Sequence, residues 1–174
     1  MKRVKFYMNP PNRIFPGLKA DIDIILDGLD GIVNLCSAET KRLERQEKLW
    51  PVEIEGLGKY VHDYINGLED VFERIVKQID QDPPTGPHWH KDLIFRVTKE
   101  IEGVRPKVID SELRDQLFEY AGFRHVFRHS YLTGIKWNRL KPLCDRLPNL
   151  HKQIKANLET FFSSLTGFDS PENY

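Results

Sequence analysis

The 174-residue chain is long enough for one domain with a sizeable hydrophobic core. Its 40% hydrophobic and 30% charged residues are typical of a soluble globular protein, and two cysteines are too few for a disulfide framework. The formal net charge of zero excludes attraction of the whole protein to polyanions. Acidic residues nevertheless outnumber basic ones in residues 51–82, and the reverse holds in residues 121–160. A basic face is therefore still expected.

The N-terminal residues do not read as a targeting signal. Residues 1–16 contain three prolines and lack the apolar segment of a signal peptide, and no apolar run approaches the length of a membrane span. We therefore expect an N-terminal tail over residues 1–16, one domain over residues 17–168 and a C-terminal tail over residues 169–174. We expect no membrane contact and a cytoplasmic location.

Two long amphipathic helices are predicted first. From Gly17 onward, apolar residues recur at steps of three and four, which predicts a helix that ends near Pro51. A second apolar stripe predicts a second helix, closed by the proline- and glycine-rich loop of residues 82–87. The first stripe consists of Leu18, Ile22, Ile25, Leu29, Ile32, Cys36 and Leu43. The second consists of Leu57, Val61, Tyr64, Leu68, Val71, Phe72, Ile75 and Ile79. Together they indicate an antiparallel hairpin of long helices, with Cys36 as a buried structural residue.

Shorter helices follow the loop. One is predicted over residues 93–101, and the next begins at an N-cap formed by Asp110 or Ser111 and runs to about Leu132. Asn138 is predicted to cap a short helix, and Pro148 to open the last helix. Since no strand pattern exceeds a few residues, the fold class is all-α: an up-and-down bundle of long helices with one or two short extra helices.

The most unusual stretch is residues 124–131, in which polar side chains share one side of a predicted helix. A helix turns by about 100° per residue. With Arg124 at zero, Arg128 lies at about 40° and Tyr131 at about −20°. His125 and His129 lie at about 100° and about 140°. All five side chains therefore fall on one arc of less than half the circumference.

These side chains suit phosphate and proton chemistry. Histidine titrates near neutral pH and acts as a general base or acid, and arginine binds phosphate in a forked geometry. A base beside a phosphate clamp is what cleavage of RNA by its own 2′-hydroxyl requires. The residues alone leave three interpretations open: a solvated basic face, a phosphate or RNA site, and a metal site. The metal site would pair His125 and His129 with His88 and His90, but no third strong ligand is evident. The residues alone leave this alternative open, and our prediction names no metal and no cofactor.

Trp89 and His90 allow two interpretations. A tryptophan before a helix is most simply a packing anchor, and a histidine there is most simply a helix cap. The alternative is that both side chains support the site on residues 124–131.

The spacing Arg124-x4-His129-x-Tyr131 matches the R-x4-H-x-Y signature of HepT-type toxins, within the HEPN superfamily of small helical nucleases. Over roughly residues 18–166 the chain resembles the HepT-like ribonuclease domain. Further blocks that carry the resemblance are Trp89–Leu93, Arg105-Pro106 and Trp137–Leu143. The resemblance implies a HEPN-type helical bundle.

The resemblance also implies an activity. HEPN domains form homodimers in which the motifs of both copies face one another, and the pair is a metal-independent endoribonuclease. By this analogy His129 activates the ribose 2′-hydroxyl, Arg124 holds the phosphate, and His125 orients the site or assists the leaving group. Arg128 is not part of the motif, and its spacing alone suggests an extra phosphate contact.

The resemblance finally implies partners. HepT-type toxins belong to type VII-like toxin–antitoxin pairs, in which an MntA-type nucleotidyltransferase antitoxin transfers AMP to the motif tyrosine, here Tyr131. The substrate would be RNA, either transfer or messenger RNA. The alternative functions are a non-catalytic HEPN-type helical dimer that binds RNA or a nucleotidyltransferase, and a purely structural bundle.

Overall fold

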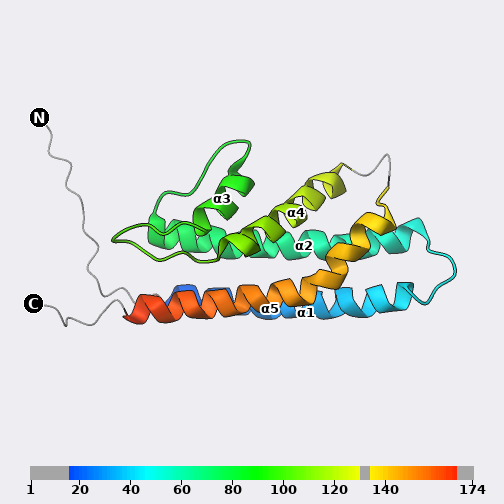
Figure 1. Ribbon diagram of the computed structural model, residues 1–174, viewed down its shortest axis with the longest axis horizontal. Coiled ribbons are helices and arrows are strands. Elements are labelled where there is room, and N and C mark those ends of the chain that lie inside the picture. The colour runs from blue at the N-terminus through cyan, green and yellow to red at the C-terminus, as the bar shows by residue number, and fades with distance from the viewer. Residues whose placement is uncertain (1–15, 130–133, 168–174) are drawn as a thin grey trace, which may run out of the picture.

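The computed structural model describes residues 16–129 and 134–167, which are almost entirely helical (Figure 1). The elements are α1 (Pro16–Leu43), α2 (Pro51–Ile75), the π-helix η1 (Val76–Asp80), α3 (Trp89–Val97), α4 (Ser111–Arg128) and α5 (Trp137–Gly167). Within these ranges the only β structure is an isolated bridge between Ile101 and Arg105. The predicted all-α bundle is confirmed. The predicted tails lie outside the described residues, apart from Pro16, which begins α1.

Helix α2 is the centre of the bundle, because it contacts α1, α3, α4 and α5. Figure 1 shows α1 and α5 running side by side on one side of α2, with α3 and α4 on the other. The whole second predicted stripe is buried, as is Cys36. On α1, however, Leu26 and Val33 are buried while Ile25 and Ile32 are only partly so. Among the described helices, none combines the length and the apolar character needed to cross a membrane.

The predicted boundaries of four helices are wrong. Helix α3 spans Trp89–Val97 rather than residues 93–101. Helix α1 ends at Leu43, and Pro51 opens α2 instead of closing α1. Proline is favoured in the first turn of a helix, where its missing N–H has no partner to lose. The Glu53 carboxylate accepts a hydrogen bond from the Trp50 N–H at 3.1 Å and so helps to start α2. Helix α4 ends at Arg128, before the predicted Leu132, although Asp110 caps its start as predicted.

The remaining error concerns α5, which is one helix from Trp137 to Gly167 rather than two. Pro142 and Pro148 lie inside it. An interior proline removes one backbone donor and kinks a helix, and Figure 1 shows the first part of α5 running obliquely to the remainder. The helix continues because its buried side chains form one stripe across both prolines. This stripe comprises Leu140, Leu143, Cys144, Leu147, Leu150, Ile154, Leu158 and Phe161.

A buried ion pair attaches α3 and the following loop to the end of α2. Asp80 accepts hydrogen bonds from Arg105 Nε at 2.6 Å and Nη2 at 2.9 Å, and from Arg96 Nε at 2.7 Å. The Asp80 and Arg105 side chains are fully buried, and Arg105 also donates to the backbone carbonyls of Lys99 and Pro106. This network holds α3 over α2 and thereby positions the first turn of α3 near α4.

Candidate active site

Arg124 points from α4 toward α2. Its Nε donates a hydrogen bond to Asn66 Oδ1 at 2.6 Å and lies 3.6 Å from Glu69 Oε2. Asn66 and Glu69 are three residues apart on α2 and so share one face of that helix. The Asn66 amide is itself placed by His62, whose Nδ1 is 3.1 Å from Asn66 Nδ2. Only 16% of the Arg124 side chain is exposed, so the guanidinium is held in one orientation.

His90 from the first turn of α3 completes this cluster. Its Nδ1 lies 2.8 Å from Glu69 Oε2, and the Trp89 ring stacks on the imidazole with centroids 3.6 Å apart. Within the described chain, the second carboxyl oxygen of Glu69, Oε1, is buried without a hydrogen-bond partner. Three helices therefore converge on Glu69. The contact of His90 with Glu69 matches the supporting interpretation, whereas Trp89 also packs against the hydrophobic core, as a packing anchor would.

The charges of the cluster follow from its burial. Burial raises the pKa of the Glu69 carboxyl to about 7, against the opposing attraction of Arg124. Burial lowers the pKa of His90 to about 4, and the positive charges of Arg124 and Arg128 act in the same direction. Near neutral pH, His90 is therefore uncharged, and its Nδ1 shares a hydrogen bond with the Glu69 carboxyl. Glu69 itself gains or loses its proton close to neutrality, directly beside Arg124.

We expect Glu69→Gln to stabilise the protein above pH 7 and to change its stability little near pH 4. The pKa of Glu69 is raised from 4.5 to about 7 on folding. Between these two pKa values the folded state holds a proton that the unfolded chain has lost, so the stability of the protein falls as pH rises. The contribution of Glu69 to stability is therefore fully present below pH 4.5 and is lost once pH has risen through about 7. Glutamine has no proton to lose, and the expected gain at pH 8 is about 1–3 kcal/mol. Urea unfolding at both pH values measures it.

The matched control for this prediction is Glu73→Gln, one turn further along α2. The Glu73 carboxylate is more exposed and pairs with Lys77 at 2.8 Å, so we expect no gain in stability at pH 8. If Glu69→Gln instead lowers stability at pH 8, attraction to Arg124 outweighs the cost of burying the Glu69 carboxylate.

The two motif histidines lie on the outside of α4. His125 and His129 are exposed, and their rings are 4.8 Å apart. His129 is the C-cap residue of α4, where its backbone N–H bonds to the Val126 carbonyl at 3.1 Å. Helix geometry separates Arg124 and His129 by about 140° around the axis. Within one copy of the chain, the arginine is thus directed toward α2 while the histidine is directed toward solvent.

Arg128 and Tyr131 complete the predicted set. Arg128 is exposed at the last position of α4. Tyr131 lies outside the described residues, and the helical wheel that placed it beside Arg124 does not apply because α4 ends before it. In residues 16–129 and 134–167, no three His, Cys, Asp or Glu side chains are grouped to hold a metal ion.

Asn66 and Glu69 contact Arg124, and the sequence analysis did not identify either of them. A signal for Glu69 was present, because it lies four residues after Ile65 and three before Phe72, both fully buried. A carboxylate on the buried face of a helix needs a partner. The partner's identity, however, depends on how α3 and α4 pack on α2.

The fold and this cluster define a class of protein: an all-α bundle with a largely buried arginine and an exposed histidine pair at one helix end. A family model described as "HepT-like protein" matches residues 56–165, which is more than half of the chain. The chain therefore belongs to the HepT-like family of the HEPN superfamily. The matched range contains every cluster residue named above, whereas α1 lies outside it. Comparison with curated proteins gave no match, and comparison with solved structures gave none.

Proposed function

We propose that this protein is the toxin of a type VII-like toxin–antitoxin pair and that it cleaves RNA internally without a metal ion. Membership of the HepT-like family associates the chain with toxin–antitoxin systems. The observation that carries the ribonuclease assignment is the oriented Arg124 guanidinium on the same helix end as the exposed histidines His125 and His129. We expect the protein to act in the cytoplasm on transfer or messenger RNA.

In the proposed reaction, His129 accepts the proton of a ribose 2′-hydroxyl. The 2′-oxygen then attacks the adjacent phosphorus, and the bond from phosphorus to the 5′-oxygen breaks. The 5′-oxygen takes up a proton. His125 either donates this proton or orients the site. The products are a 2′,3′-cyclic phosphate and a 5′-hydroxyl, and the balance of atoms requires no metal ion.

Arg124 stabilises the negative charge that develops on the phosphate. Its Nε donates to Asn66, and we expect its terminal nitrogens to donate to phosphate oxygens. Glu69 and His90 act through Arg124 by fixing its orientation. Arg128, exposed one turn further along α4, adds a phosphate contact.

A homodimer accounts for the divergence of these side chains. Arg124 and His129 are separated by about 140° around α4, so one copy does not direct both toward the same point. Two copies whose α4 ends face each other bring the arginine of one close to the histidine of the other. The proposed active site is therefore shared between two chains.

We expect an MntA-type nucleotidyltransferase to add AMP to Tyr131 and to abolish cleavage. The modification adds bulk and negative charge close in sequence to a site that receives RNA phosphate. Incubation with the cognate transferase and ATP, followed by mass spectrometry, should give a mass increment of AMP that is absent in Tyr131→Phe. An increment that persists in Tyr131→Phe would assign the modification to another residue.

The alternative is a non-catalytic dimer that binds RNA or a nucleotidyltransferase. The contacts of Arg124 with Asn66 and Glu69 support this alternative, because an arginine held by these two residues can stabilise the fold without taking part in cleavage. Incubating RNA with the purified protein in EDTA separates the two functions. The ribonuclease proposal requires products with a 2′,3′-cyclic phosphate, whereas the binding dimer would retain intact RNA.

A further inference from the structure

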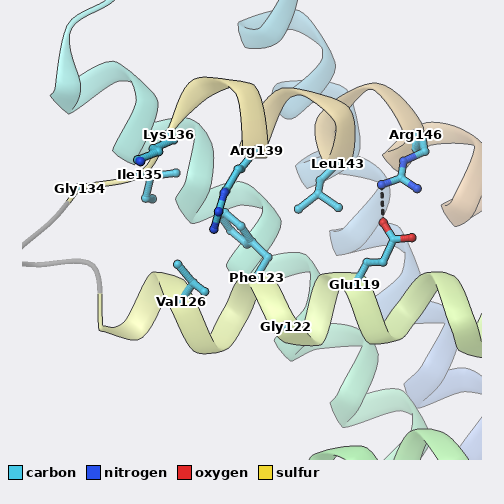
Figure 2. Close-up of a pocket in the computed structure, with 10 residues that line it drawn as sticks. All are labelled: Glu119, Gly122, Phe123, Val126, Gly134, Ile135, Lys136, Arg139, Leu143 and Arg146. Carbon is cyan, nitrogen blue, oxygen red and sulfur yellow. Dashed lines mark hydrogen bonds and ion pairs between the residues drawn. The ribbon is translucent and has the colours of Figure 1, made fainter.

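A cleft of about 360 Å³ lies between α4 and the start of α5 (Figure 2). Its apolar lining includes Phe123 and Val126 from α4, and Ile135 and Leu143 from the α5 side. Val126 is 48% exposed, although it is a large apolar residue on a packed helix. The volume is at the small end of the range of about 300–1,000 Å³ for ligand sites, which suits a ligand of the size of one nucleotide.

The rim of the cleft is basic. Lys136, Arg139 and Arg146 line it from α5 and the segment just before it. Arg146 is neutralised by Glu119 at 2.6 Å, and Figure 2 shows this pair at one end of the cleft. Lys136 and Arg139 form no ion pair with a residue that the structure describes, and Figure 2 shows Arg139 extending from α5 toward α4. Two cations without an ion-pair partner among the described residues therefore lie beside the apolar lining of the cleft.

The cleft borders the face of α4 that carries the motif histidines. Gly122, which lines the cleft, is about 60° from His125 around the helix axis. Val126 follows His125 directly in the chain. A strand of RNA whose phosphate reaches the histidines therefore passes the mouth of the cleft.

We propose that this cleft binds one nucleotide of single-stranded RNA beside the cleaved phosphate, an assignment that rests on the ribonuclease function proposed above. The base lies on the apolar surface of Val126 and Ile135, and the flanking phosphate contacts Lys136 and Arg139. A purely apolar ligand would not contact either cation, and a simple anion would leave the apolar lining of the cleft exposed to water. A nucleotide satisfies both, because it joins a flat aromatic face to a phosphate.

Filling the cleft with a side chain tests the proposal. A Cβ at Gly122 meets no atom within 4 Å, so Gly122→Leu should fold normally and occupy the cleft. The matched control is Gly56→Leu on α2. A Cβ at Gly56 also meets no atom within 4 Å, but Gly56 does not line the cleft. The probe is a fluorescently labelled 2′-O-methyl RNA, which lacks the attacking hydroxyl and cannot be cleaved.

By fluorescence anisotropy, we expect Gly122→Leu to bind this RNA about tenfold more weakly, and Gly56→Leu to bind as the unmodified protein does. Lys136→Ala and Arg139→Ala should each weaken binding and lower its salt dependence by about one counterion. Equal affinity of Gly122→Leu and the unmodified protein would overturn the subsite, as would no binding to the unmodified protein. If light scattering detects a changed oligomeric state in Gly122→Leu, the subsite is refuted and the cleft is instead an interface between two copies.

The same proteins, tested on cleavable RNA in EDTA, keep this proposal separate from the ribonuclease function. Cleavage by the unmodified protein together with unchanged RNA affinity in Gly122→Leu refutes the subsite alone. Weakened binding in Gly122→Leu without cleavage by the unmodified protein refutes the ribonuclease function and supports the nucleotide subsite.

Discussion

Replacing His129 by alanine is expected to lower the rate of RNA cleavage by about 10²–10⁴-fold, the range that loss of a general base produces. The imidazole is exposed just beyond the last turn of α4, so the substitution removes a reacting group without leaving a cavity. Single-turnover cleavage in EDTA measures the effect. The His129→Ala protein should also fail to inhibit growth when expressed without its antitoxin.

Two controls sharpen this prediction. Urea unfolding of His129→Ala should match that of the unmodified protein, which excludes a loss of fold as the cause. His125→Ala should reduce cleavage less, because His125 assists a step that His129 begins. Undiminished cleavage by His129→Ala would refute the assignment of His129 as the general base.

Arg124→Ala is expected to lower cleavage by about 10²–10³-fold, as removal of one group that stabilises the transition-state charge does. Arg124→Lys should not restore the rate. The Nε that donates to Asn66 belongs to a planar fork, and lysine offers a single ammonium group in its place. The assay is the same single-turnover reaction, with RNA affinity measured in parallel so that binding and chemistry are separated.

The role of Arg124 in the fold is separable from its role in cleavage. Its loss leaves the buried Glu69 carboxylate without a neighbouring positive charge, which costs stability above pH 7. The double variant Arg124→Ala/Glu69→Gln should recover that stability but not the activity. If it recovers the activity too, Arg124 has a structural role alone.

Mixing variants tests the shared active site. A dimer of one Arg124→Ala copy with one His129→Ala copy should regain cleavage, because one of its two sites combines the intact arginine of one chain with the intact histidine of the other. A mixed dimer that remains inactive would mean that both side chains act from the same copy.

Several features followed from local patterns alone. The apolar repeat at steps of three and four identified the helices, because burial of one helix face requires that spacing. The whole buried stripe of α2 and the Asp110 cap of α4 were predicted correctly. The helix boundaries at prolines were not predicted correctly, because proline occurs in the first turn of a helix as well as just after its end. In the folded protein Pro51 lies in the first turn of α2, whereas α5 continues through Pro142 and Pro148. Side-chain packing between helices decides between these outcomes.

The chemistry of the site depends on contacts between remote segments. The motif on α4 was readable as a cluster of arginine and histidine, but its orientation was not. Arg124 meets Asn66, 58 residues away, and Glu69 meets His90 from another helix, 21 residues away. Such pairings depend on how α3 and α4 rotate and pack on α2, and local periodicity carries no information about them. The raised pKa of Glu69, the inward direction of Arg124 and the cleft beside the histidines therefore emerge only when the helices are assembled.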